Sequence, residues 1–181
     1  MSFLRFLAPR PMGVPSPPPS PIESETEAVR NIVARLEALP PDRARFLAGT
    51  AYVLARSANA DMEIGETELQ TIEDVLVDTG LDRSQALLVA EMAKLQERTT
   101  GGTSDYLVTR EFREGSTVEQ RLELLGSCYR VAAADRGISS IETAVLDEIA
   151  NELGLDREQA AQVRARFADR ISARLSYRPE G

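Results

Sequence analysis

Two acidic turns carry the side chains best suited to chemistry. Residues 60–68 read A-D-M-E-I-G-E-T-E, and residues 134–142 read A-D-R-G-I-S-S-I-E, so each turn has an aspartate followed seven residues later by a glutamate. Clustered carboxylate oxygens are the ligands that a hard cation such as Ca²⁺ prefers. If the two turns lie together, the candidate ligands of a divalent cation are Asp61, Glu63, Glu68, Asp135 and Glu142.

The rest of the composition excludes several other kinds of site. The 181-residue chain has no histidine and a single cysteine, Cys128. A Ser-His-Asp triad, a Cys-His pair, a histidine zinc site, a Cys-x-x-Cys site and an internal disulfide are therefore excluded. The acidic turns do not form an EF-hand, which needs a twelve-residue loop with more ligands. Carboxylate chemistry, hydroxyl chemistry and binding remain.

Net charge and hydropathy limit the partners. The chain has 29 acidic and 21 basic residues, a formal net charge of −8. We expect no nucleic-acid binding, because sequence-independent binding needs a cationic surface. No apolar run approaches the ~20 residues that span a bilayer, and the first residues lack the apolar region of a signal peptide, so we expect a cytoplasmic protein. A membrane contact would have to use residues 3–7, where Phe3, Leu4, Phe6 and Leu7 surround an arginine.

The chain divides into a short tail and one domain. Seven of the ten prolines lie between Pro9 and Pro21. Because proline fixes φ and lacks an amide proton, residues 1–22 should form an extended linker rather than a helix. Residues 23–177 should form one helical domain.

The domain has the hydrophobic pattern of an all-α bundle. Apolar residues recur three and four apart, and no segment alternates with period two, so we expect seven or eight helices. Residues 86–95 are apolar on most sides, which predicts a central helix there. A break is expected at 99–102.

An internal repeat organises these helices. With an offset of 74 residues, positions 54–86 align without gaps on 128–160, with 12 identities in 33 positions. Each half reads helix, acidic turn, helix, capped turn, helix. Two copies are too few for a solenoid and predict two pseudo-symmetric halves packed face to face.

The second turn of each half has a structural explanation. Gly80 and Gly154 suit the left-handed residue that ends a helix. Asp82 and Asp156 suit the N-cap of the next helix, and a glutamine three residues later completes a capping box. No function is assigned to this turn.

The acidic turns have a structural alternative as well. Glu142 forms a capping box with Ser139, and Glu68 stands in the same helix position. Capping therefore explains both glutamates without a metal. It does not explain Asp61 and Asp135, which follow a helix C-terminus, where the helix dipole disfavours an anion. For these two aspartates both hypotheses stay open.

The two turns resemble a motif of the tellurite-resistance protein B (TerB) family, A-D-G-x-[IV]-x-x-x-E in two copies. The resemblance covers roughly residues 43–173 and implies an all-α bundle of about seven helices with pseudo-two-fold halves. It also implies a divalent cation, notably Ca²⁺, held by Asp61, Glu68, Asp135 and Glu142. The similarity is closer to a branch of the family that is not linked to tellurite.

The sequence departs from the family motif after each aspartate. The usual glycine is replaced by Met62 in the first turn and by Arg136 in the second. An arginine beside Asp135 would compete with a metal for that carboxylate. We therefore expect either an asymmetric site in which the first turn dominates, or turns that bind no ion.

Three functional hypotheses follow. The first is a non-enzymatic cytoplasmic module that binds a cation and meets an unidentified protein partner in a stress or envelope-associated context. The second is a purely structural interaction module in which the acids are only caps. The third is a carboxylate enzyme, for which no spacing selects a substrate. Arg166, Arg170 and Arg174 recur every four residues and predict a solvated face, or a docking stripe for an acidic surface.

Overall fold

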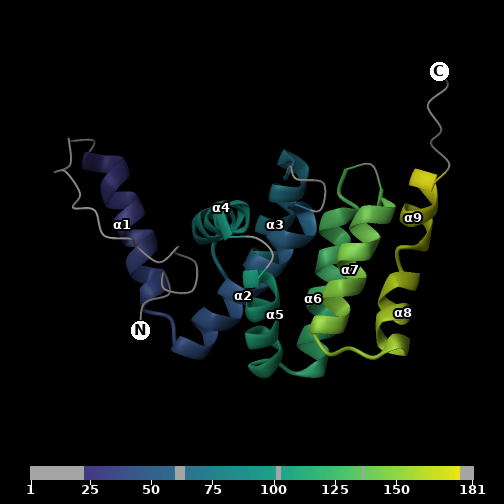
Figure 1. Cartoon of the computed structure of the whole chain (residues 1–181). Helices are drawn as coiled ribbons and strands as arrows, with labels where there is room; N and C mark the ends of the chain where they lie inside the picture. Colours follow the sequence, from purple (N-terminus) through teal and green to yellow (C-terminus); the bar gives the residue numbers. More distant parts are fainter. Residues whose placement is uncertain (1–22, 60–63, 101–102, 136, 176–181) are drawn as a thin grey trace, which may run out of the picture.

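The fold is entirely α-helical over the part of the chain that the computed structural model describes, residues 23–59, 64–100, 103–135 and 137–175 (Figure 1). The helices are α1 (Glu23–Glu37), α2 (Pro41–Ala58), α3 (Glu66–Asp78), α4 (Arg83–Thr100), α5 (Thr103–Glu114), α6 (Val118–Ala132), α7 (Ser140–Glu152), α8 (Arg157–Ala165) and α9 (Ala168–Leu175). The predicted fold class is confirmed. Residues 1–22, with the proline-rich segment and Phe3 to Leu7, lie outside the described ranges.

The central helix is α2, and the prediction that 86–95 would be central is wrong. Every residue of α2 from Leu47 to Ala58 is buried, and α2 packs against α3, α4, α5, α6 and α7. In α4, Val89, Ala90 and Ala93 are buried but Leu87 and Leu95 are exposed. Helix α4 therefore has one buried face, and its extra apolar residues are on the surface.

The sequence repeat is visible in the order and packing of the helices. With the 74-residue offset, α2 corresponds to α6, α3 to α7, and α4 to α8 with α9. The packing is reciprocal, because α2 contacts α7 and α6 contacts α3. Helix α5 has no equivalent among the described helices. Figure 1 shows α5 in front of α2, with α1 at one edge of the molecule and α8 and α9 at the other.

Aromatic packing accounts for the extra helix. Where seven or eight helices were expected, the last one is divided at Arg166 and Phe167. In the first half, Ala93 of α4 and Ala55 of α2 are small, and α4 is continuous. Their equivalents are Phe167 and Tyr129, whose rings stack with centroids 5.2 Å apart. We attribute the division to this larger side-chain volume.

The capped turns form as the sequence predicts. Gly80 and Gly154 have φ values of 99° and 68°. The bond from the Leu81 amide to the Leu76 carbonyl, 3.2 Å, together with its equivalent from Leu155, closes each helix end. The Asp82 and Asp156 N-caps and their glutamine partners are also present.

Helices α2 and α6 lie side by side and run in the same direction. Near their beginnings, Phe46 and Thr50 of α2 line the same cavity as Gln120 and Leu124 of α6. Near their ends, the Ser57 hydroxyl is in hydrogen-bond contact with the Cys128 thiol. The acidic turns that follow these two helices therefore begin at the same end of the bundle.

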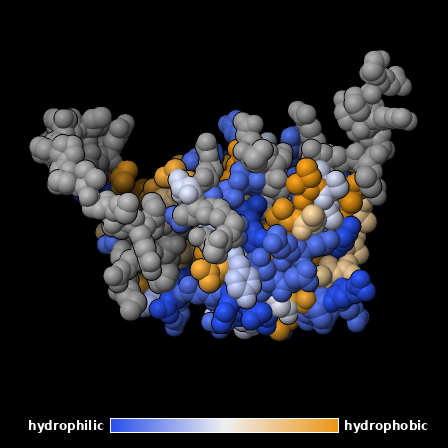
Figure 2. All heavy atoms as spheres, in the orientation of Figure 1, coloured by the Kyte–Doolittle hydropathy of each residue, from blue (hydrophilic) through white to orange (hydrophobic). Residues whose placement is uncertain are grey.

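The surface is mainly hydrophilic on the face shown in Figure 2, with apolar residues in separate groups. Within the described ranges, no helix is both long and apolar enough to cross a membrane.

Candidate functional site

The candidate site lies where α2 and α6 end. Asn59 caps the end of α2 and Ala133 the end of α6, and an isoleucine in each following turn, Ile64 or Ile138, is buried in the core. Each acidic motif is therefore attached to the core through its isoleucine. Asp61 and Glu63 of the first motif lie outside the described residues.

The two glutamates of the motifs are helix caps. The Gly65 amide donates to Glu68 Oε2 at 2.8 Å, and the Ser139 amide donates to Glu142 Oε2 at 2.6 Å. Glu68 and Glu142 are 9% and 5% exposed. Each carboxylate is therefore held at its turn by a backbone amide, as the capping interpretation predicts. One of its oxygens is already a hydrogen-bond acceptor.

The second turn is bonded to α9. Arg170 donates a guanidinium hydrogen bond to the Ala133 carbonyl, and its own carbonyl accepts from the Ile138 amide at 3.2 Å. A fixed positive charge thus lies against the turn that contains Asp135, which is itself exposed. At the equivalent position of the first half stands the uncharged Gln96. The prediction of a solvated arginine face is right for the exposure of Arg166 and Arg170 but did not include this bond.

The described residues do not by themselves form a metal centre. Over the described ranges, no three or more Cys, Asp or Glu side chains are grouped so that they could hold an ion. Glu68, Asp135 and Glu142 are therefore not sufficient ligands as they stand. The candidate site depends on Asp61 and Glu63.

A buried charge cluster near the end of α2 was missing from the sequence predictions. The Arg56 guanidinium lies 2.6 Å from Glu152, 3.0 Å from Glu148 and 3.7 Å from Asp105. The Tyr52 hydroxyl donates to Asp105 at 2.7 Å. Burial works to lower the pKa of Arg56, but the hydrogen bond from Arg56 to Glu152 and the neighbouring carboxylates raise it above its ordinary value. We call these residues the Arg56 cluster.

Glu97 adds a further carboxylate beside this cluster. Its side chain is 8% exposed, and Oε2 has no hydrogen-bond partner among the described residues. Burial raises the pKa of Glu97 above its usual range, and Asp105 raises it further, against an opposing hydrogen bond to Asn59 and the charge of Arg56. Asn59 directly precedes the first acidic turn, so Glu97 adds acidity on that side of the bundle end.

Comparison with known proteins now identifies the fold. The family model described as "Tellurite resistance protein TerB" matches residues 47–165, more than half of the chain. The chain belongs to the TerB family. No match was found among curated proteins or among solved structures.

The repeat contained a signal for the Arg56 cluster that the TerB resemblance did not point to. Arg56 and Arg130 are an identical pair at the 74-residue offset, and Asp78 is the equivalent of Glu152. In the TerB domain Arg130 bonds to Asp78 at 3.5 Å, so both halves use the same arginine-to-acid pair across the interface between them. The available signal for this pair was an arginine that is identical in both copies of the repeat, two residues before an alanine that is also identical in both.

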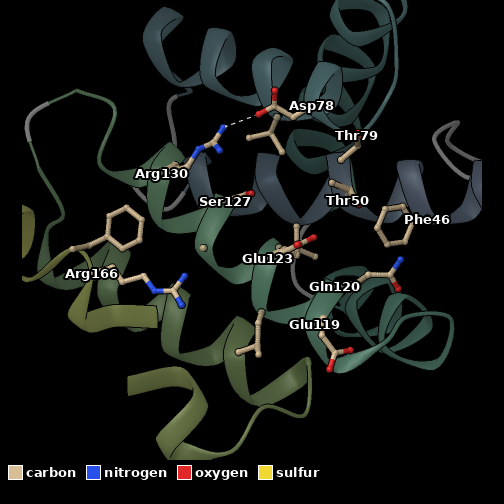
Figure 3. Close-up of a pocket in the computed structure, with 15 residues that line it drawn as sticks. Phe46, Thr50, Asp78, Thr79, Glu119, Gln120, Glu123, Ser127, Arg130 and Arg166 are labelled. Atoms are coloured by element: carbon tan, nitrogen blue, oxygen red, sulfur yellow. Dashed lines mark hydrogen bonds and ion pairs between the residues drawn. The ribbon is translucent and has the colours of Figure 1, made fainter. Parts of the chain in front are cut away.

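An open groove lies beside Arg130. It has a volume of about 560 Å³ and is bounded by α2, α3, α6 and the turn between α8 and α9. Figure 3 shows Glu123 directed into its middle, with Phe46 and Thr50 on the α2 side and Arg130 bonded to Asp78 at one end. The groove therefore has both apolar and charged walls, with Arg130 and its partner Asp78 at one end, Glu123 in the middle and Glu119 farther from Arg130.

Cys128 and Tyr129, two further reactive groups of the TerB domain, are buried in the core. Burial raises the pKa of the Cys128 thiol to about 12, although contacts with Ser57 and Arg56 oppose this. Burial also raises the pKa of Tyr129 to about 12. Because the thiolate is the reactive form of cysteine, Cys128 acts as a small core residue.

Proposed function

We propose that this TerB domain binds one divalent cation, with Ca²⁺ preferred, at the end of the bundle where α2 and α6 end. The first acidic turn supplies the main ligands, Asp61, Glu63 and Glu68. The second turn contributes through Asp135 and Glu142. The observation that carries the proposal is the parallel course of α2 and α6, which puts the starts of both motifs at one end of the molecule.

The chemistry of the residues supports a hard cation. The proposed ligands are all carboxylates, and the chain has no histidine that would favour zinc. The capping bonds of Glu68 and Glu142 hold two of these carboxylates in place before any ion arrives. A preformed orientation reduces the entropy that is lost on binding.

The surroundings support a dominant first turn. Arg170 places positive charge at the second turn, whereas the acid Glu97 lies beside Asn59 at the start of the first. A cation is attracted to the first environment and repelled by the second.

The capping bonds also favour a second candidate function, a purely structural module in which both glutamates serve only as caps.

Isothermal titration of the full chain with Ca²⁺, Mg²⁺, Mn²⁺ and Zn²⁺ tests the proposal. We expect one Ca²⁺ per chain, with a Kd between about 0.1 μM and 1 mM, the range of sensor and extracellular sites. Asp61→Asn should weaken binding at least about tenfold, and Asp135→Asn should weaken it less, because each removes a ligand charge. Asp147→Asn is the matched control, since Asp147 is an exposed acid of α7 paired with Arg164.

Two results would overturn the proposal. Absence of heat together with an unchanged melting temperature would leave the structural module. Equal losses of Ca²⁺ affinity in Asp61→Asn and in the Asp147→Asn control would mean that Ca²⁺ binding depends only on the net charge of the protein.

A further inference from the structure

The groove beside Arg130 occupies the place that α5 covers in the other half of the bundle. In the first half, α5 packs along the face of α2 formed by Arg45, Phe46, Gly49, Tyr52 and Arg56. Their equivalents at the 74-residue offset are Glu119, Gln120, Glu123, Gly126 and Arg130. All five of these equivalents line the groove.

The contacts of α5 show how closely a helix fits this kind of surface. A Cβ atom added to Gly49 would lie 3.0 Å from Phe112 Cδ2, and the rings of Phe46 and Phe112 are 5.1 Å apart. A Cβ atom added to Gly126 would meet nothing within 4 Å. The same helix face is thus covered in the first half and open in the second.

A buried hydroxyl supplies a second observation. Thr50 lines the groove from the α2 side and is 3% exposed. Its Oγ1 has no hydrogen-bond partner among the described residues. A buried polar group without a partner costs free energy, and a ligand that fills the groove could satisfy it.

The charges of the groove define its occupant. On α5, Asp105 faces Arg56, and Glu111 faces Arg45 six residues later. In the groove, Arg130 keeps the charge of Arg56, but Glu119 reverses the charge of Arg45. Glu123, which replaces Gly49, is exposed and has no ion pair within the described ranges. A complementary helix therefore needs an acid in its first turn and bases near its end.

We propose that the groove binds an amphipathic helix of a partner protein in the position equivalent to α5. That helix carries an acidic residue opposite Arg130 and basic residues six and seven positions later, opposite Glu119 and Glu123. Such a charge order also matches the dipole of the bound helix, since acids favour its N-terminus and bases its C-terminus. Helix-in-groove recognition of this kind is a recurring mode of peptide binding. The inference does not depend on the cation site.

The probe is a twelve-residue peptide with the sequence of α5 carrying Glu111→Arg and Phe112→Lys, acetylated and amidated at its ends. Because an isolated helix of this length is marginal, we expect a Kd of about 0.1–1 mM, which amide chemical shifts of the full chain can follow. The shifted residues should lie on the walls of the groove. Gly126→Trp, which fills open space, should abolish these shifts.

A charge exchange provides the specific control. Glu119→Arg should weaken binding of the probe about fivefold, a change typical of one exposed ion pair. The same variant should recover the affinity for a peptide that retains Glu111. Circular dichroism confirms that each variant is folded.

Three results would contradict the inference. The first is the absence of shifts, and the second is a set of shifts away from α2, α3 and α6. The third is a dimer in sedimentation that Gly126→Trp dissociates, because the groove would then belong to a second copy of the chain.

Discussion

The two halves of the bundle place the same arginine-to-acid pair in equivalent positions but in different surroundings. In the first pair, Arg56 and Glu152 have side chains that are 7% and 11% exposed. In the second, Arg130 and Asp78 are 47% and 68% exposed. The two pairs differ only by the one methylene group that distinguishes Glu152 from Asp78. The surroundings, and not the residues of the pair, therefore decide how deeply each pair is buried.

The covering helix α5 makes the difference. It contributes Asp105 to the first pair and excludes water from it, whereas the second pair borders an open groove. Burial strengthens electrostatic attraction but adds a desolvation cost, and exposure reduces both. One repeated unit thus supplies an internal structural cluster in one half and an accessible surface in the other.

The largest expected effect comes from removing the arginine of the buried pair, and removal of the exposed arginine is its comparison. Arg56→Met should destabilise the domain by about 3–5 kcal/mol, because buried carboxylates lose their counter-charge. Arg130→Met should cost less than about 1 kcal/mol, since its pair is exposed. Urea unfolding followed by circular dichroism measures both. Similar losses would mean that α5 does not set the energetic difference.

Glycine-to-alanine substitutions on α2 and α6 compare the covered helix face with the open one. Gly126→Ala should stabilise the domain by about 0.5–1 kcal/mol, because it improves helix propensity in open space. Gly49→Ala forces Phe112 to move from a close contact and should be destabilising by about 1–3 kcal/mol. Thermal unfolding of the two variants gives the comparison. A stabilising Gly49→Ala would show that α5 packs more loosely than described.

Glu97 offers a smaller effect with a defined dependence on pH. Its equivalent is Ile171, so only the first half buries a carboxylate here. Burial raises the pKa of Glu97 in the folded state, so the folded protein favours the protonated form. The protein therefore loses stability as the pH rises from the ordinary pKa of a glutamate through the raised pKa of Glu97. Glu97→Gln should therefore stabilise the protein by about 1 kcal/mol at pH 7 and have little effect at pH 4.

The Glu97 measurement is made in the presence of a chelator, so that bound cation does not contribute. Unfolding curves from pH 4 to pH 8 for both proteins give the difference in stability. An equal difference at both ends of that range would exclude titration of Glu97 as its cause.

Much of this architecture could be predicted from residue types. The helix period, the glycine and aspartate of each capped turn, and the 74-residue offset together indicate a two-fold helical bundle. The offset also contained the pair of arginines. What the offset could not show is which half α5 covers, because α5 lies outside the repeat and its packing is a tertiary property.

The candidate site was only partly predictable. Glu68 and Glu142 follow from cap chemistry, which depends on local sequence. The contact of Arg170 with the second turn joins residues 37 positions apart and has no local signal. The burial of Glu97 likewise depends on its neighbours, since its own segment is rich in polar residues. The prediction of a central helix at 86–95 was wrong for a similar reason. Leu87 and Leu95 are apolar, but their exposure is decided by tertiary packing.

Helix α5 turns one of two equivalent ion pairs into a buried cluster. Paired double-mutant cycles measure this difference, with Arg56→Met and Glu152→Gln in one cycle and Arg130→Met and Asp78→Asn in the other. We expect a coupling energy of about 2–3 kcal/mol for the first pair and below about 0.5 kcal/mol for the second. Equal coupling energies in the two cycles would contradict it.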